Sequence, residues 1–327
     1  ENTYWLYSPR SLEKDIPTTD KIKNIVVSGK RFWTLLALSK ELKKNPPDVF
    51  WSPSNFFPYN LPQKSVATIH DLAFHLFPHS YSWKSRLLSR FTLKRAIKSA
   101  DKLIAVSRQT KKDLKRCFNV PGENIEVIYH SLRTDFQQQP FDFQKNYPGL
   151  DQYFIYVGRL ELRKNLPNII IAFHNFLSQT DRPVKLLLAG PKGYGYRSIK
   201  QLIKKLALKN KVIFKDYIPA EHLPTLYEKS LGVIFVSRYE GFGLNILEGF
   251  AAGVPVMTSN FGAMAEIAGN AALLVNPFNP KDISDGFYQL YSDTNLRQTL
   301  VDKGKIRLED FDWKKSAQKL IELWKTL

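Results

Sequence analysis

The amino-acid sequence predicts an α/β protein of two doubly wound domains, each with a parallel sheet, that face each other across a cleft. The chain has 327 residues, which is more than one hydrophobic core usually organises. Short apolar runs alternate with helical patterns in both halves, as in parallel sheets with crossover helices. A stretch rich in Gln, Asp, Pro and Gly lies between the halves and indicates a linker.

The same observations divide the chain into four parts. We expect an N-terminal domain over residues 1–135, a linker over residues 136–152 and a C-terminal domain over residues 153–312. Residues 313–327 alternate like a helix, which makes this segment a candidate for packing back onto the N-terminal domain.

Apolar runs and helical periodicity place the individual elements. In the N-terminal domain the predicted strands are Asn24–Ser28, Val49–Ser52, Val66–His70, Leu103–Val106 and Ile125–Tyr129, and the predicted helices lie near Arg31–Lys44, Trp83–Ser99 and Gln109–Phe118. In the C-terminal domain the predicted strands are Phe154–Val157, Lys185–Ala189, Val212–Lys215, Gly232–Val236, Pro255–Thr258 and Leu273–Val275, with helices near Pro167–Leu177, Ser198–Leu208, Ala220–Lys229 and Leu244–Ala252.

Amino-acid composition and net charge limit which classes of protein and which kinds of partner fit this chain. Hydrophobic residues make up 43% and charged residues 24%, which is typical of a folded globular chain. The net charge of +18 favours anionic partners but does not distinguish a lipid phosphate, a nucleotide or a nucleic acid. Because the basic residues form no nucleic-acid recognition motif, we predict no nucleic-acid partner.

Cysteine content and hydropathy indicate the compartment. The single cysteine, Cys117, cannot form an internal disulfide, which indicates a reducing compartment and excludes a cysteine metal site. No apolar run is long enough to span a membrane, and residues 1–10 do not resemble a signal peptide. We therefore expect a cytoplasmic protein.

The strongest functional motif is EGFGLNILE, residues 240–248, which follows a predicted strand and leads into a predicted helix. Gly241 and Gly243 remove side chains from the turn, so that backbone N–H groups can approach a ligand closely. The helix start adds unpaired N–H donors and a positive dipole end, which suits a phosphate or sugar oxygens. A glycine turn by itself has no functional meaning, but two carboxylates, Glu240 and Glu248, flank this one.

This motif resembles the Glu-x7-Glu motif of retaining glycosyltransferases with the GT-B fold, in the large family numbered four (glycosyl transferases group 1). The resemblance extends from about residue 48 to residue 327. It is carried by VGRLELRKN at 157–165, LLAGP at 187–191, SNFGAMAEIAGNAALLVNP at 259–277, TIHDL at 68–72 and ADKLIAVS at 100–107. The fold implied is GT-B, two Rossmann-like domains with the nucleotide sugar on the C-terminal one and the acceptor on the N-terminal one.

The resemblance also implies roles for individual residues. Arg159 and Lys164 would bind the donor diphosphate, since two fixed cations stabilise a leaving group that gains negative charge. Glu240 would lie near the transferred sugar, and Glu248 would bind the ribose. The remaining matches place further residues around the donor. The sugar and phosphates would contact Gly158, Gly241, Phe242, Gly243 and Leu244, and the base would contact Tyr217 and Ile218. From the N-terminal domain, His70 and Asp71 would face the cleft, with the backbone carbonyl of His70 against the donor sugar.

The implied reaction retains the anomeric configuration. No carboxylate stands out as the nucleophile that a double displacement needs, so we expect a reaction on one face in which the leaving phosphate takes the acceptor proton. No Asp-x-Asp metal motif occurs in the donor region, so no metal or other cofactor is expected. The chain resembles bacterial mannosyl- and related transferases of cell-surface polysaccharide assembly, which suggests a GDP-mannose-like donor and a glycan or lipid-linked acceptor in polysaccharide biosynthesis.

The basic stretch over residues 79–116 has two interpretations. Its central part, residues 81–98, places Leu87, Phe91, Lys94 and Lys98 along one helical side with Trp83 nearby. A basic amphipathic helix with aromatic residues can bind an anionic membrane surface, which would make the protein peripheral on the inner membrane face. The alternative is a core helix with a solvated basic face.

The sequence departs from the family pattern at its start. Residues 1–8 resemble a later strand, and the family's first strand and glycine-rich loop have no counterpart. We expect an upstream segment or a partner chain to complete the domain, since a missing strand leaves an open sheet edge. Asn245 also replaces a common proline, and His130-Ser-Leu replaces Asn-Gly-Val. Because of the shortened start, a nucleotide-sugar-binding scaffold without turnover is the alternative to an enzyme.

Overall fold

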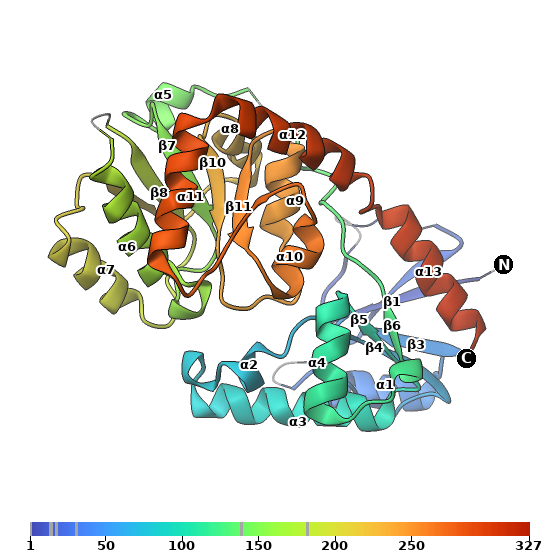
Figure 1. Ribbon diagram of the computed structural model, residues 1–327. Coiled ribbons are helices and arrows are strands. Elements are labelled where there is room, and N and C mark those ends of the chain that lie inside the picture. Colours follow the sequence, from blue (N-terminus) through green and yellow to red (C-terminus); the bar gives the residue numbers. More distant parts are fainter. Residues whose placement is uncertain (1, 13–15, 17–18, 30–31, 138–139, 181–182) are drawn as a thin grey trace.

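A computed structural model describes the chain except residues 1, 13–15, 17–18, 30–31, 138–139 and 181–182. Two α/β domains lie side by side, joined by a connection that passes between them (Figure 1). All pairs of strands within the three sheets of the described residues are parallel. The predicted fold class is confirmed.

The N-terminal domain contains two separate sheets. Strands β1 (Tyr4–Ser8) and β2 (Ile22–Val26) form one, and the order β3-β4-β5-β6 forms the other, with β3 Val49–Ser52, β4 Lys64–Ile69, β5 Lys102–Ala105 and β6 Ile125–Val127. The helices and 3₁₀ turns are α1 Ala37–Lys44, α2 Ala73–Leu76, η1 Pro78–Ser80, α3 Trp83–Ser99, α4 Arg108–Phe118 and η2 Gly122–Asn124. Serine caps begin both long helices, because Ser82 and Ser107 accept hydrogen bonds from the first-turn amides of Ser85 and Thr110.

The C-terminal domain has a six-stranded sheet in the order β12-β11-β10-β7-β8-β9. The strands are β7 Tyr153–Val157, β8 Lys185–Ala189, β9 Val212–Lys215, β10 Gly232–Phe235, β11 Val256–Ser259 and β12 Leu273–Val275. The helices and turns are η3 Leu162–Lys164, α6 Leu166–Leu177, α7 Tyr196–Lys205, η4 Ala220–His222, α8 Leu223–Glu228, α9 Leu244–Ala251, α10 Gly262–Ala268, α11 Pro280–Ser292 and α12 Thr294–Leu308. Buried strands covered by helices on both faces are the usual arrangement of parallel sheets.

Two segments link the domains. Residues 136–152 contain the short helix α5 (Phe143–Asn146), and Phe136, Tyr147 and Leu150 of this segment are buried in the core of the C-terminal domain. The last helix, α13 (Trp313–Lys325), crosses to the N-terminal domain (Figure 1). There Leu323 packs with buried residues of β4 and β5, because its apolar side matches that face of the four-stranded sheet.

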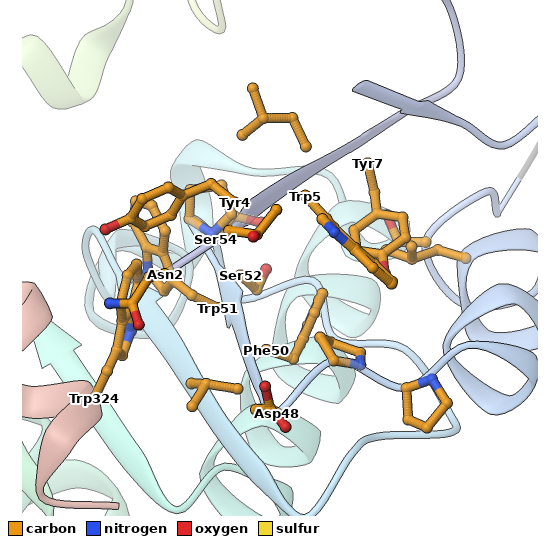
Figure 2. A pocket seen from close by; sticks show the side chains of 18 of the residues that line it. Asn2, Tyr4, Trp5, Tyr7, Asp48, Phe50, Trp51, Ser52, Ser54 and Trp324 are labelled. Carbon is orange, nitrogen blue, oxygen red and sulfur yellow. The ribbon is translucent and has the colours of Figure 1, made fainter. Parts of the chain in front are cut away.

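A cavity of about 830 Å³ separates β1 from β3, the edge strands of the two N-terminal sheets. Figure 2 shows this cavity, which we call the strand gap. Tyr4 and Trp51 contact Trp324 of α13 on one side, with ring centroids 6.3 and 6.1 Å away. On the other side Tyr7 and Trp33 pack with the cluster that includes residues of α1. The gap therefore lies in the layer of the sheet, with helices over both faces.

Several predicted element boundaries differ from the observed ones, and three of these differences have a clear physical reason. The strand predicted at residues 24–28 spans Ile22–Val26, because pairing with β1 sets its limits. The helix predicted from Arg31, a residue outside the described ones, begins at Ala37 after a series of turns. The helix predicted over residues 220–229 is divided into a 3₁₀ turn and α8, since Pro224 has no N–H for a continuous helix.

Candidate active site

The centre of the candidate site is an ion pair between loops that follow two neighbouring strands. Lys164 lies in η3 after β7, and Glu240 lies in the loop after β10. The two strands pair directly, so their carboxyl ends meet at one edge of the sheet. Lys164 Nζ is 2.6 Å from Glu240 Oε1, and both side chains are largely buried, at 14% and 11% exposed. The sequence motifs at 157–165 and 240–248 are thus brought into direct contact.

A second cation, Arg163, joins this pair although sequence reasoning did not select it. Its guanidinium lies 3.4 Å from Glu240 Oε2 and 3.0 Å from Glu161 Oε1, and it donates to the Tyr239 carbonyl at 2.9 Å. The nearby carboxylates outweigh the effect of burial and raise the pKa of Arg163. We call Glu161, Arg163, Lys164 and Glu240 the ionic cluster. The sequence alone shows that Lys164 lies in a loop at the end of a strand. It does not show that the side chain of its neighbour, Arg163, points inward.

The protonation state of Glu240 follows from this cluster. Burial alone would raise the pKa of its carboxyl, but Lys164 and Arg163 outweigh burial and lower the pKa below its usual value. Glu240 is therefore ionised at neutral pH, with one oxygen held by each cation. A ligand hydroxyl that binds Glu240 has to share these oxygens or displace a cation.

The glycine loop, residues 240–243, touches the N-terminal domain. A Cβ atom on Gly241 would lie 1.7 Å from the carbonyl oxygen of His70, so only glycine fits between the two backbones. Gly243 has a φ of +121°, which side chains rarely adopt, and α9 begins at the next residue, Leu244. Phe242 is buried among aromatic rings, with Tyr129 6.1 Å away. The loop thus presents the start of α9 at the junction of the domains.

Glu248 lies one turn into α9 and has polar partners of its own. Tyr227 donates to Glu248 Oε2 at 2.8 Å and Asn245 donates to the same oxygen at 3.2 Å. Burial raises the pKa of Glu248, although Tyr227, Arg133 and Asn245 act against it. Asn245, which replaces a common proline, and Tyr227 were not among the predicted site residues, and their role appears only from these contacts.

The other predicted donor-side residues lie around the ionic cluster without joining it. Gly158 and Arg159 follow β7, and the Arg159 side chain is exposed to solvent. Tyr156 donates to the Arg159 carbonyl at 3.1 Å, which fixes the backbone of this loop. After β9, the Tyr217 side chain is 79% exposed and Ile218 is buried. The cluster therefore gathers Lys164 and Glu240, whereas Arg159, Tyr217 and Glu248 surround it separately.

The N-terminal domain contributes groups from the opposite side. His70 and Asp71 follow β4, and Asp71 Oδ1 accepts a hydrogen bond from the Ala73 amide at 2.8 Å. Tyr81, at the start of the basic stretch, lies close enough to Arg163 and Glu240 for their charges to affect its pKa. Burial chiefly raises the pKa of Tyr81 to about 12. Tyr81 was not predicted at the site, because nothing in the sequence links it to the C-terminal domain.

Hydrogen bonds hold the domains together beside the site. Tyr239 bridges them, because its hydroxyl accepts from the Leu72 amide at 3.2 Å and donates to Asp113 at 3.1 Å. Glu266 of α10 accepts hydrogen bonds at 2.7 and 2.9 Å from the Arg108 and Gln109 amides, which begin α4. A carboxylate at a helix N-terminus is a favourable pairing. The candidate site is thus enclosed by contacts from both domains.

Family comparison agrees with the motifs at this site. The description "Glycosyl transferases group 1" matches residues 137–307, which contain the whole ionic cluster and the glycine loop. The description "Glycosyltransferase Family 4" matches residues 16–136. The chain belongs to the group 1 glycosyltransferases. The family resemblance predicted from the sequence motifs is confirmed.

Individual relatives of this glycosyltransferase are named for mannose transfer. O-antigen chain mannosyltransferase B of Escherichia coli is 28% identical over 285 residues, which are 85% of this chain and 74% of the relative. O-antigen chain mannosyltransferase RfbU of Salmonella typhimurium is 30% identical over 67% of this chain and 58% of the relative. The match to RfbU thus leaves a substantial part of that relative uncovered.

Solved structures share the fold of this glycosyltransferase. Sucrose-phosphate synthase from Thermosynechococcus elongatus superposes with a TM-score of 0.76 at 22% identity, covering 95% of this chain and 84% of the other. HepE from Anabaena, solved with UDP and glucose, gives 0.75 at 20% identity, covering 97% and 88%. These likenesses establish the GT-B arrangement of two Rossmann-like domains.

Proposed function

We propose that this glycosyltransferase moves a hexose from a nucleotide diphosphate to an acceptor hydroxyl, with retention and without a metal ion. The observation that carries the proposal is the buried Lys164–Glu240 pair, 2.6 Å apart, beside the glycine loop at the carboxyl end of the C-terminal sheet. Ligands of open α/β sheets bind at this edge. Lys164 and the exposed Arg159 would meet the diphosphate, and the start of α9 would add backbone N–H groups.

The state of Glu240 supports a reaction on one face of the sugar. Lys164 and Arg163 hold its two oxygens, which disfavours Glu240 as the covalent nucleophile of a double displacement. In the proposed reaction the anomeric C–O bond to the diphosphate breaks, and the acceptor oxygen bonds to the same face. The leaving phosphate oxygen takes the acceptor proton. Glu240 would bind sugar hydroxyls, while Glu248, oriented by Tyr227, would bind the ribose hydroxyls.

We propose that the transferred sugar is mannose and that the donor is GDP-mannose. The relatives named O-antigen chain mannosyltransferases support mannose. A glycan or lipid-linked glycan would be the acceptor, in polysaccharide biosynthesis. Exposed Tyr217 and buried Ile218 are proposed to contact the base.

A donor panel tests the proposed reaction. The purified chain is incubated with GDP-mannose, UDP-glucose or UDP-N-acetylglucosamine, with EDTA or with added Mg²⁺, and NMR follows the products. With water as the acceptor, we expect GDP-mannose to release GDP and α-mannose, at the same rate with EDTA. A β product would contradict retention, and loss of turnover in EDTA would contradict metal independence. Thermal stabilisation by GDP-mannose without hydrolysis or transfer would support the nucleotide-sugar-binding scaffold instead.

We also propose that α3 binds an anionic membrane surface, which would bring the site to a lipid-linked acceptor. Trp83, Leu87, Leu88 and Phe91 of α3 are exposed at 69%, 63%, 39% and 46%, and we call these four side chains the α3 face. Basic side chains surround the α3 face, namely Lys84, Arg86, Arg90, Lys94 and Lys98. Apolar and basic groups together suit the boundary between headgroups and acyl chains. No helix among the described residues is long and apolar enough to cross a membrane.

Vesicle sedimentation tests the membrane proposal. The chain should sediment with phosphatidylglycerol vesicles and much less with phosphatidylcholine vesicles. Leu87→Ser combined with Phe91→Ser should release it. The matched control is Ile306→Ser on α12, an apolar side chain that is also 69% exposed but lies outside the α3 face. Equal sedimentation of the double variant and the control would contradict the proposal.

Finally, we propose that an extended segment from outside residues 1–327, either upstream in the same polypeptide or from a partner chain, fills the strand gap. The edges of β1 and β3 both border the gap, and strand edges offer unpaired N–H and C=O groups. Tyr7 and Trp324 are two of the residues that line the gap, and each has a buried polar side-chain atom, the Tyr7 hydroxyl and Trp324 Nε1, with no hydrogen-bond partner among the described residues. An added strand would supply partners to both edges.

Amide hydrogen exchange tests the strand proposal. In the 327-residue chain alone, amides of β1 and β3 should exchange much faster than those of the buried β4. A polypeptide that includes the flanking sequence, or the complex with a partner chain, should protect β1 and β3 together. Slow exchange of both strands in the isolated chain would contradict the proposal, because their edge N–H groups would then already be protected without an added strand.

A further inference from the structure

Two histidines from different strand ends form a hydrogen-bonded pair at the edge of the N-terminal sheet. His70 follows β4 and His130 follows β6. His70 Nδ1 is 3.2 Å from His130 Nε2, and the rings stack with centroids 5.2 Å apart at 19°. The other nitrogen of His70, Nε2, is 2.7 Å from the Pro53 carbonyl oxygen, which follows β3. Both ring nitrogens of His70 are therefore bound by the protein itself.

The chemistry of these partners fixes where the protons lie. A carbonyl oxygen only accepts, so His70 Nε2 carries a proton and donates to Pro53. In a neutral imidazole the second nitrogen is then an unprotonated acceptor, and His130 Nε2 must carry the proton that points at His70 Nδ1. Both rings are thus Nε2–H tautomers.

His130 is held in place by groups from both domains. Its ring meets Phe242 of the glycine loop edge-on at 5.4 Å, and Trp313 at the start of α13 lies 5.9 Å away. Burial, and secondly the nearby His70, lower the pKa of His130 to about 4, which keeps it neutral. The main chain of His70 abuts Gly241 of the same loop. The two histidines therefore contact the glycine loop at two successive residues, Gly241 and Phe242.

We propose that His130 is a positioning residue: it donates to Nδ1 of His70, whose Nε2–H tautomer is set by the Pro53 carbonyl, and so fixes the ring and holds the His70 main chain against the glycine loop. His70 then serves the site through its backbone and fixed position, and its imidazole transfers no proton to or from the substrate. The effect on catalysis rests on the proposed sugar transfer. The hydrogen bond between His70 and His130 is observed in the structure, and it can be tested without measuring any activity.

The first experiment measures the tautomers directly. The chain is labelled with ¹⁵N-histidine, and long-range ¹H–¹⁵N correlation spectra are recorded at pH 7.5, with signals assigned through His130→Phe. We expect His70 and His130 both to show the Nε2–H pattern in the native chain. In His130→Phe, His70 should keep the Nε2–H form that the Pro53 carbonyl sets, but the ¹⁵N shift of its Nδ1 should move, because that nitrogen loses its hydrogen bond. An Nδ1–H pattern for His70 in the native chain would overturn the proposal.

The second experiment asks whether the hydrogen bond, and not merely the ring, matters for transfer. His130→Phe keeps an aromatic ring against Phe242 but loses the donor, and kcat/KM should fall about tenfold. His130→Gln retains an N–H donor and should restore the rate to within about twofold of the native chain. His174→Gln, an exposed histidine on α6, is the control and should change neither spectrum nor rate.

The outcomes separate the two proposals. Equal rates for His130→Phe and the native chain would overturn the positioning role. If the native chain shows no transfer with any donor, the proposed function fails, while the tautomer spectra still decide whether the histidine pair exists. A variant that does not fold leaves the native spectra as the deciding measurement.

Discussion

Lys164 Nζ lies 2.6 Å from Glu240 Oε1, although the two residues are 76 positions apart in the chain. This contact joins the loops after β7 and β10, and it places a cation and a carboxylate where a nucleotide sugar would bind. Lys164, together with Arg163, keeps Glu240 ionised in a largely buried place. The pair therefore contributes both to the charge of the site and to the packing of its loops.

Removing the cation should separate these contributions. In Lys164→Ala we expect transfer to fall by about 10²–10³-fold, since one preorganised group facing a developing charge is lost. Glu240 keeps Arg163 as a partner, so the fold should persist, with the free energy of unfolding reduced by about 1–3 kcal/mol. Lys192→Ala is the control, because its pair with Asp216 lies on the surface. Undiminished turnover in Lys164→Ala would remove the proposed diphosphate contact.

Glu240 should make stability depend on acid pH. Burial opposes ionisation, but the charges of Lys164 and Arg163 prevail and lower its pKa in the folded protein. A lowered folded-state pKa means that the stabilisation is complete above the unfolded value, about 4.3, and is lost as pH falls through the lower folded value. In Glu240→Gln, the part of the acid-dependent loss of stability that comes from Glu240 should disappear. Urea unfolding at pH 5, 4 and 3 measures it, and parallel plots of unfolding free energy against pH for the two proteins would contradict the assignment.

Tyr227 should tune nucleotide binding through Glu248. Its hydroxyl donates to Glu248 Oε2 at 2.8 Å and thereby orients the carboxylate. Tyr227→Phe keeps the ring and loses this bond, so GDP affinity should fall about five- to tenfold. Glu248→Gln should cost more, because it changes the proposed ribose ligand itself. Isothermal titration with GDP checks both, and unchanged affinity in Glu248→Gln would place the ribose elsewhere.

The close approach of Gly241 and His70 predicts a sharp effect of one methyl group. In Gly241→Ala the new Cβ would overlap the His70 carbonyl oxygen, so one backbone must move. We expect a loss of about 1–3 kcal/mol in stability, by analogy with overpacked cores, and a larger radius of gyration as the domains part. Gly122→Ala is the matched control, since its Cβ would meet only the Lys115 side chain at 3.6 Å or more. X-ray scattering and thermal unfolding compare the two, and identical results would contradict a close interdomain contact.

Local sequence patterns predicted the elements that depend on local physics. The helix predicted at Trp83–Ser99 is found over the same residues, because Ser82 caps its start and the chain becomes extended at Ala100. Strands β8 and β9 also match their predicted limits, since Gly190 and Pro191 follow β8 and the charged Lys211 and Asp216 bound β9. The strand near residue 24 was misplaced because its partner, β1, sets its register.

At the site, strand-end motifs were visible in sequence but their partners were not. The spacing of Lys164 and Glu240 after apolar runs indicated loops at one sheet edge, which is what parallel topology requires. The sequence did not indicate that Arg163 would point inward, that Tyr227 would bind Glu248, or that Tyr81 would reach the ionic cluster. Each of these depends on side-chain directions set by packing between distant segments.

The sequence by itself determined the fold class, the family and the loops that carry the candidate chemistry, because periodicity, turn residues and motif spacing are local properties. Only the tertiary structure decided which charges pair, where Gly241 meets His70, that His130 stacks on His70, and that a strand-sized gap separates β1 from β3. The physical reason is that a contact between distant residues depends on the relative placement of whole elements, which many packed side chains fix together.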